Sequence, residues 1–205
     1  MTQQPSTRER LLAAAERVLL SEGVDGLSLR SVTAAAGVNV ASVNYTFGGK
    51  DALLEALSER LLEPLTAERI RRIDEVTQAQ NCTVEDLLTA YTMPLLGMDL
   101  RVAPLYIELL VKPRVEDNAR LRQVGVGVIR PGLDRLLDAL QVALPEHPRE
   151  ILEVRIQLLF GGATLCLRDW ITTGADRAPL VRELVAVGTA GLSAPTPSQG
   201  KWPQG

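Results

Sequence analysis

The strongest limit on the fold comes from residues 28–54, which read SLRSVTAAAGVNVASVNYTFGGKDALL. Ser28 is a favourable helix N-cap, and apolar residues follow it at helical spacing. Gly37 comes directly after that run, and glycine adopts the left-handed backbone that ends a helix at little cost. The segment therefore predicts two short helices joined by a tight turn, an arrangement that many proteins use to enter the DNA major groove.

The second of these helices is predicted to begin after Asn39, which is another favourable N-cap. Val40, Val43 and Phe47 recur along it at three- and four-residue spacing, so Val43 and Phe47 are predicted to lie in the core. Val40 has two interpretations, as a packing residue or as a residue that faces DNA. The other side of the helix carries Ala41, Ser42, Asn44, Tyr45 and Thr46.

A further helix precedes this pair. Ser6 and Glu9 match a capping box, and an apolar stripe follows them up to Gly23, before which the helix is predicted to end. This helix covers the apolar sides of the two short ones in the expected fold. Because three helices of this size bury a limited area, we expect support from the rest of the chain.

Three segments, in order and at fixed spacing, resemble the TetR family of bacterial transcriptional regulators: TRERLLAAAERVLLSEG, LRSVTAAAGVNVASVNYTF and GGKDALLEAL. The resemblance covers residues 7–57. It implies a helix-turn-helix DNA-binding domain over residues 1–55 and a ligand-binding and dimerisation domain over residues 56–192. Residues 193–205 are rich in Pro, Gly and Ser, which predicts a disordered tail.

The resemblance also implies roles on DNA. Val40 and Ala41 are expected nearest the base edges, where their side chains offer only apolar contact, for example to a thymine methyl. Polar and cationic side chains are expected on a base edge or on phosphates, which position a protein without specifying sequence. These residues are Ser28, Arg30, Asn39, Ser42, Asn44, Tyr45, Thr46 and Lys50.

Two positions depart from the family pattern. Thr46 stands where His is very frequent, so it lacks an imidazole for the phosphate contact, and Gly49 stands where Ser often caps the next helix. Residues 1–55 carry five cations and six anions, a formal balance of minus one. The predicted domain is therefore not a basic patch, and we expect a modest salt dependence of DNA binding.

Simpler interpretations stand beside these DNA roles. Ser28 and Asn39 are helix caps whatever else they contact. Tyr45 has an alternative place as a half-buried aromatic residue, and Arg30 and Lys50 have one as solvated charges.

The remainder of the chain predicts an all-α fold, because sustained period-two alternation is scarce. The expected helices run from Lys50 toward Gln78 with a bend or an interruption near Pro64, from Thr83 to near Pro94, and over 103–111, 115–144, 149–173 and 177–192. The helix over 115–144 is predicted to kink at its glycines and at Pro131.

The last two helices, 149–173 and 177–192, combine broad apolar surfaces with small residues that allow close helix approach. The TetR resemblance implies a homodimer in which these helices of two chains form a four-helix bundle. Its two-fold axis would set the recognition helices about 34 to 36 Å apart on one face of the DNA. The alternative is that both faces complete a core within one chain.

The resemblance further implies a small-molecule cavity in the second domain. Its candidate lining residues are Tyr91, Met93, Met98, Leu105, Tyr106, Leu109 and Phe160, each of which also fits ordinary core or surface. This lining favours an apolar or amphipathic effector, and Arg101, Lys112 or Arg168 could meet an acidic head group. A faint similarity to fatty-acid-responsive members makes a fatty acid or acyl conjugate the leading candidate.

Composition and motifs argue against other classes of protein. The 205 residues are 46% hydrophobic with a formal net charge of −3, and no run approaches the roughly 18 apolar residues of a membrane span. A cytoplasmic protein without membrane contact is expected. Cys82 and Cys166 are predicted to be ordinary buried thiols, and His147 a surface turn residue. Since no nucleophile elbow, phosphate-binding glycine loop or metal cluster occurs, we expect neither an enzyme nor a cofactor.

These expectations describe a ligand-responsive regulator bound to double-stranded operator DNA, most simply a repressor that a small effector releases. Activation by the same device stays open. The rival interpretation is a helical protein-interaction scaffold without ligand response, which would leave the outward face of residues 39–46 without a purpose.

Overall fold

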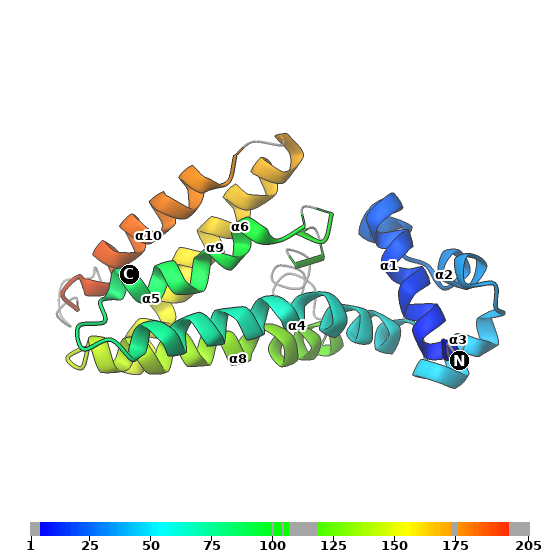
Figure 1. Ribbon diagram of the computed structural model, residues 1–205, viewed down its shortest axis with the longest axis horizontal. Coiled ribbons are helices and arrows are strands. Elements are labelled where there is room, and N and C mark those ends of the chain that lie inside the picture. The colour runs from blue at the N-terminus through cyan, green and yellow to red at the C-terminus, as the bar shows by residue number, and fades with distance from the viewer. Residues whose placement is uncertain (1–4, 100, 104, 107–118, 174–175, 197–205) are drawn as a thin grey trace, which may run out of the picture. The chain divides into compact units, whose positions relative to one another are not determined.

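The computed structural model describes residues 5–99, 101–103, 105–106, 119–173 and 176–196, in which all regular secondary structure is helical (Figure 1). The all-α prediction is therefore confirmed. The chain forms two compact units, Met1–Glu68 with Gly97–Pro131 and Arg69–Leu96 with Gly132–Gly205. The helices α4 and α8 contribute residues to both units. The division into functional domains at residue 55 stays a prediction.

The first unit contains α1 (Thr7–Gly26), α2 (Leu29–Ala36), α3 (Val40–Phe47) and the first part of α4 (Lys50–Thr77). In this three-helix group α1 packs against both α2 and α3. The apolar stripe of α1 is buried there, as predicted, and it includes Leu11, Leu12, Ala15, Val18 and Leu19. In the same unit, the buried hydroxyl of Thr66 on α4 donates to the Val128 carbonyl at 2.8 Å.

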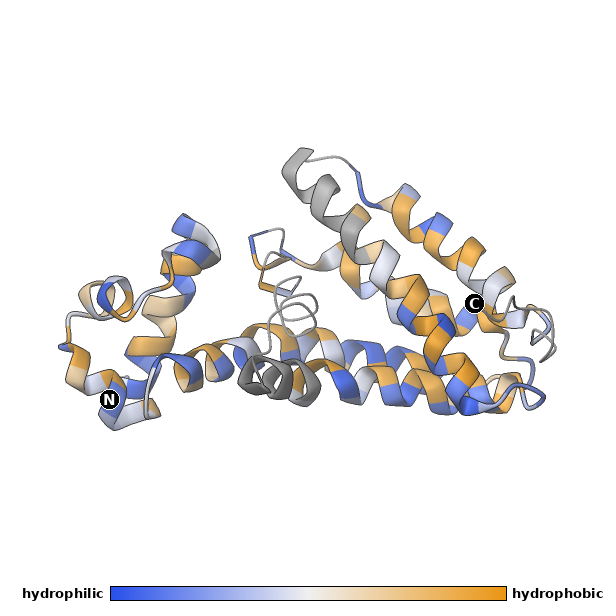
Figure 2. Ribbon diagram, turned by 180° about the vertical axis from the view of Figure 1, so that it is seen from behind, coloured by the Kyte–Doolittle hydropathy of each residue, from blue (hydrophilic) through white to orange (hydrophobic). Residues whose placement is uncertain are grey.

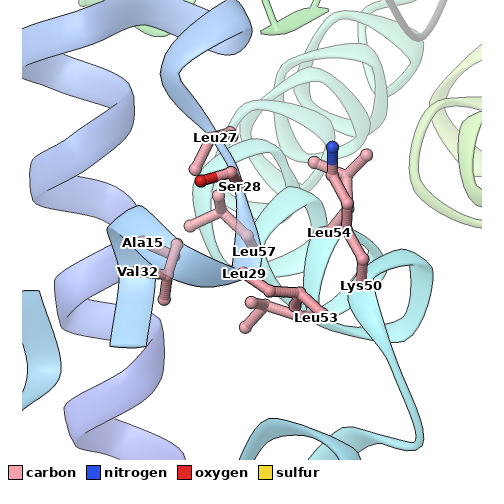
Figure 3. A pocket seen from close by; sticks show the side chains of 9 residues that line it. All are labelled: Ala15, Leu27, Ser28, Leu29, Val32, Lys50, Leu53, Leu54 and Leu57. Atoms are coloured by element: carbon pink, nitrogen blue, oxygen red, sulfur yellow. The ribbon is translucent and has the colours of Figure 1, made fainter. Parts of the chain in front are cut away.

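The start of α4 closes the core of the helix-turn-helix group. Figure 3 shows a small pocket where side chains of α1, α2 and α4 meet. Its walls include Ala15 from α1, Val32 from α2, and Leu53 and Leu57 from α4. The cavity volume is about 20 Å³, close to that of one water molecule, and the walls are apolar. The core is thus nearly filled, as close packing requires.

The ends of α1 follow the sequence signals. At the start, the Glu9 amide donates to Ser6 Oγ at 3.2 Å and the Ser6 amide donates to Glu9 Oε2 at 2.8 Å, which confirms the capping box. At the other end, the helical backbone is interrupted at Gly23, whose φ of 72° and ψ of −172° are not helical. The uninterrupted helix therefore ends before Gly23, as predicted, and a short helical stretch follows it to Gly26.

The second unit contains α5 (Val84–Thr92), α9 (Arg149–Thr173), α10 (Ala178–Ser193) and parts of α4, α6 (Pro94–Gly97) and α8 (Ala119–Ala143). Within it, α10 packs against α5 and α9. In the coloured parts of these helices, hydrophobic and hydrophilic residues are interspersed (Figure 2). The core residues include Leu87, Leu88, Leu136, Leu140, Leu152, Ile156 and Val185.

Several predicted helix bounds in the second half of the chain are confirmed. α9 covers the predicted range 149–173, and α10 ends within one residue of the predicted limit. Pro64 lies inside α4 and Pro131 inside α8, and both helices continue through their proline. The predicted helix over 103–111 and the tail lie largely outside the described residues, as does the start of the helix predicted over 115–144.

The predictions for His147 and for the two cysteines are wrong. His147 is only 3% exposed, because its turn folds back on the end of α10. There its Nε2 lies 2.8 Å from the Ala194 carbonyl, and its Nδ1 lies 3.0 Å from the Glu146 carboxylate. Cys82 is half-buried and Cys166 is exposed on α9. In each case the burial depends on contacts distant in sequence, which local composition does not reveal.

No described helix has both the length and the apolar character that crossing a membrane demands.

Candidate nucleic-acid interface

The start of α2 is held by Ser28, as predicted. The Ser31 amide donates to Ser28 Oγ at 3.0 Å, and the Ser28 amide donates to Ser31 Oγ at 3.0 Å. This reciprocal pair is a capping box, in which serine takes the place that Glu or Gln more often occupies. The Ser28 hydroxyl is therefore engaged in the cap, although its side chain is exposed.

The turn between α2 and α3 depends on Gly37, whose φ of 65° and ψ of 39° are left-handed. Its amide donates to the Ala34 carbonyl at 3.2 Å, and the Val38 amide donates to the Thr33 carbonyl at 3.0 Å. A side chain with a β-carbon is strained in this backbone region. The turn therefore has the geometry that the sequence predicted.

The start of α3 is capped by Asn39. Its Oδ1 accepts hydrogen bonds from both the amide and the hydroxyl of Ser42, each at 2.9 Å. Both polar side chains are thus used within the protein at this point. Since Asn39 Oδ1 already has two donors, its amide nitrogen is the group better placed for a DNA contact.

Four residues on the outward face of α3 are exposed, while Val43 is fully buried on the opposite side. Tyr45 is 96% exposed and Val40 is 44% exposed. The half-buried interpretation of Tyr45 is therefore wrong, and so is the interpretation of Val40 as a buried packing residue. Ala41 and Asn44 are exposed beside them, and Thr46 is half-buried.

Phe47, predicted to be a core residue, is only half-buried. The guanidinium of Arg8 lies over its ring, with Cζ 5.4 Å from the ring centroid. A cation in this position is attracted by the ring face. Arg8 therefore links α1 to the end of α3.

The cations of the helix-turn-helix group fall into two classes. Arg8, Arg10 and Arg17, all on α1, contact α2 or α3. Arg30 and Lys50 are exposed, and neither makes a side-chain hydrogen bond or ion pair in the described part of the chain. These two are the cations most available for a phosphate or a base.

The candidate effector residues are distributed over both units. Tyr91, Met93 and Phe160 belong to the second unit, where the rings of Tyr91 and Phe160 lie 5.0 Å apart. Met98, Leu105 and Tyr106 belong to the first, and Leu109 lies outside the described residues. Tyr91, Leu105 and Tyr106 are buried, whereas Met93 is exposed.

Sequence reasoning missed the buried charge beside Tyr91. Arg69 of α4 is only 1% exposed. Its Nε donates to the Tyr91 carbonyl at 3.0 Å, and its Cζ lies 4.2 Å from the centroid of the Tyr91 ring. Burial of an arginine requires such hydrogen-bonding and aromatic partners. The sequence contains no local signal for this burial, since Arg69 stands in the polar run AERIRRIDE.

Comparison with known proteins identifies the family. Residues 11–57 match the sequence profile of bacterial regulatory proteins of the tetR family. The helix-turn-helix segment of this chain therefore belongs to the TetR family of bacterial regulatory proteins.

One curated relative is the HTH-type nicotine-responsive transcriptional repressor HdnoR of Paenarthrobacter nicotinovorans. It is 36% identical over 67 residues, which are 33% of this chain and 34% of HdnoR. The match thus spans about a third of the relative's length.

Solved structures extend the likeness to nearly the whole chain. A protein of unknown function from Rhodococcus sp. RHA1 has 25% identity and a TM-score of 0.64, covering 94% of this chain and 98% of that one. The fatty acid degradation regulator FadR from Bacillus halodurans has 19% identity and a TM-score of 0.66, covering 94% and 99%. The multidrug binding protein EbrR, complexed with imidazole, has 22% identity and a TM-score of 0.59, covering 96% and 99%. The fold of these solved structures therefore extends through both units of this chain.

Proposed function

We propose that this TetR-family protein is a homodimeric, DNA-binding transcriptional repressor that a small apolar or amphipathic effector releases from its operator. The observation that carries the proposal is the outward face of α3, on which Tyr45 is 96% exposed. A fully exposed tyrosine ring is unusual on a surface helix that has no partner. On DNA, the hydroxyl of this side chain would be a good donor to a phosphate.

The rest of the α3 face fits a base-reading surface of few direct contacts. Val40 and Ala41 are exposed and offer methyl groups, which complement a thymine methyl. Asn44 is exposed and its amide can pair bidentately with adenine. Because few side chains read bases directly, dimer spacing and DNA shape should contribute much of the specificity.

The proposal of a homodimer is supported by the apolar face of α9 and α10. Leu158 is 73% exposed and Val187 is 60% exposed. Between them lies a groove of about 350 Å³ that Leu159, Gly188 and Gly191 also line. Large apolar side chains around a groove are typical of a protein–protein interface, and a two-fold contact places the same patch on both subunits.

The proposed effector is a small apolar or amphipathic molecule. The relatives are named for a nicotine response, for fatty acid degradation and for multidrug binding. All three names are compatible with the aromatic pair Tyr91 and Phe160 as part of an apolar wall. A fatty acid or acyl conjugate stays our leading candidate.

The effector is proposed to act through α4, which begins three residues after α3 and contributes to both units. An effector shifts the operator-binding equilibrium only by its differential affinity for the two states, typically about 1–3 kcal/mol. This range corresponds to a change in operator affinity of about 5- to 150-fold.

Selection of bound DNA from random sequence, at a known salt concentration, tests the proposal that the protein binds an operator. We expect a pseudo-palindrome with half-sites one helical turn apart. The proposal that an effector releases the protein is tested by adding long-chain acyl species, nicotine or a lipophilic cation to the protein–operator complex. Failure to enrich any sequence would contradict the DNA-binding proposal. Release by nicotine or by the cation alone would replace the acyl candidate.

A further inference from the structure

Two arginines of α1 bind the end of α2. Arg10 Nη2 donates to the Ala36 carbonyl at 2.8 Å, and Arg17 Nη2 donates to the Ala35 carbonyl at 2.9 Å. Donor and acceptor are 26 and 18 positions apart in the chain, so tertiary packing alone brings them together. All four residues line one groove of the first unit, of about 380 Å³.

These bonds complete the hydrogen bonding at the end of α2. The last four carbonyls of a helix have no partner within the helix. In α2, the Gly37 and Val38 amides bind the carbonyls of Ala34 and Thr33. The two arginines bind the remaining two. A cation at a helix C-terminus is also favoured by the helix dipole.

The position of these bonds matters because Ala35 and Ala36 directly precede the Gly37 turn into α3. Resting on the DNA-binding function proposed above, we propose that Arg10 and Arg17 are positioning residues for DNA recognition. They hold the peptide groups that lead into the turn, and through the turn they set the direction of α3. Their guanidinium groups bind backbone carbonyls and do not bind DNA phosphates.

The competing assignment is a phosphate contact, which is the usual interpretation of an exposed arginine in a DNA-binding domain. Salt dependence separates the two. A lost phosphate contact lowers the slope of log affinity against log salt by about 0.9, whereas a misdirected α3 weakens binding at every salt concentration with the slope almost unchanged.

The experiment compares the full-length variants R10M, R17M and R10M/R17M with R30M on the selected operator between 50 and 200 mM KCl. Arg30 lies exposed on α2, so R30M removes the same charge without breaking a described contact. Methionine retains helix propensity and length. We expect the double variant to lose about tenfold in affinity with its slope preserved, and R30M to lower the slope by about 0.9. A slope lowered by about 0.9 for each α1 arginine, or unchanged affinity, would overturn the proposal.

Amide hydrogen exchange provides a second measurement that needs no DNA. We expect faster exchange at Gly37, Val38 and the α3 amides in R10M/R17M, and wild-type exchange there in R30M. The R10K/R17K variant, which keeps the charge and one donor nitrogen at each position, should regain part of the protection. Unchanged exchange in R10M/R17M overturns the positioning role. Faster exchange in R10M/R17M, together with a wild-type protein that binds no operator, would refute only the proposed function.

Discussion

The exposed faces of α3 and of α9–α10 differ in chemistry, although both are too apolar in places for an ordinary surface. On α3, the apolar groups of Val40 and Tyr45 stand among hydroxyls and amides. On α9 and α10, Leu158 and Val187 flank a groove with glycines in its wall. A hydrated nucleic-acid groove suits the first face, and a second apolar surface suits the other. Exposure alone therefore does not identify the partner of a face, whereas the residues around the exposed apolar groups do.

The largest effect is expected from L158E, which places a charge in the proposed dimer interface. Because Leu158 is 73% exposed in the monomer, the variant should fold normally yet fail to dimerise. Operator affinity should fall at least 100-fold, since one half-site then binds alone. Sedimentation gives the oligomeric state. V142E is the matched control, because Val142 is 82% exposed on α8, and a monomer in V142E too would remove the distinction between these surfaces.

The next effect concerns the other face. N44A/Y45A should lower operator affinity by about 10- to 100-fold, through the loss of one amide and one hydroxyl contact, while thermal stability changes little. Both side chains are exposed and do not support the core. Y45F removes only the hydroxyl, so its operator affinity should fall less than that of the double variant. Wild-type operator affinity in the double variant would show that α3 does not enter the groove as proposed.

The substitutions G188A and G37A separate the effect of packing on stability from the effect of backbone strain. In G188A the new β-carbon would lie 2.7 Å from a Leu159 methyl and 2.8 Å from a Leu88 methyl, so we expect a loss of about 1–3 kcal/mol in unfolding free energy by overpacking. In G37A the nearest side-chain atom would be Arg10 Nη2 at 3.8 Å, so only the left-handed backbone is strained, at about 1–2 kcal/mol. Urea unfolding measures both.

Shortening Leu159 separates these two causes. L159A combined with G188A should recover part of the loss, because the Leu159 methyl groups that the new β-carbon meets are then absent while the Leu88 methyl remains. The same L159A change should not rescue G37A. If L159A changed the unfolding free energy of G188A and of G37A by the same amount, the packing explanation would be contradicted.

The smallest effect is expected at the start of α5. The Thr83 hydroxyl donates to Asp86 Oδ2 at 2.7 Å, and this hydrogen bond together with the Thr83 amide holds the pKa of Asp86 below its ordinary value. A lowered folded-state pKa stabilises the protein above the unfolded pKa, and the stabilisation is lost as pH falls through the folded pKa. D86A should therefore cost about 0.5–1 kcal/mol at pH 7, and less as the pH approaches the folded pKa. A pH-independent difference from wild type would exclude this explanation.

The sequence by itself determined the local structure. Ser28, Asn39 and Thr83 act as N-caps, Gly37 takes the left-handed turn, and α9 has its predicted bounds. These features depend on side-chain-to-backbone hydrogen bonds within three or four residues and on the backbone preference of glycine. They are therefore predictable from residues that are neighbours in the sequence. The outward face of α3 was predictable for the same reason, because helical periodicity specifies which residues share a face.

Only the tertiary structure decided how distant charges and polar groups are used. Arg10 and Arg17 bind carbonyls of another helix, Arg69 is buried against Tyr91, and His147 is buried at the end of α10. No neighbouring residue in the sequence indicates the partner of any of these side chains, because only packing brings the carbonyl within reach. The physical reason is that an arginine or histidine has no fixed local partner, so its environment depends on which distant backbone groups would otherwise lack a hydrogen bond.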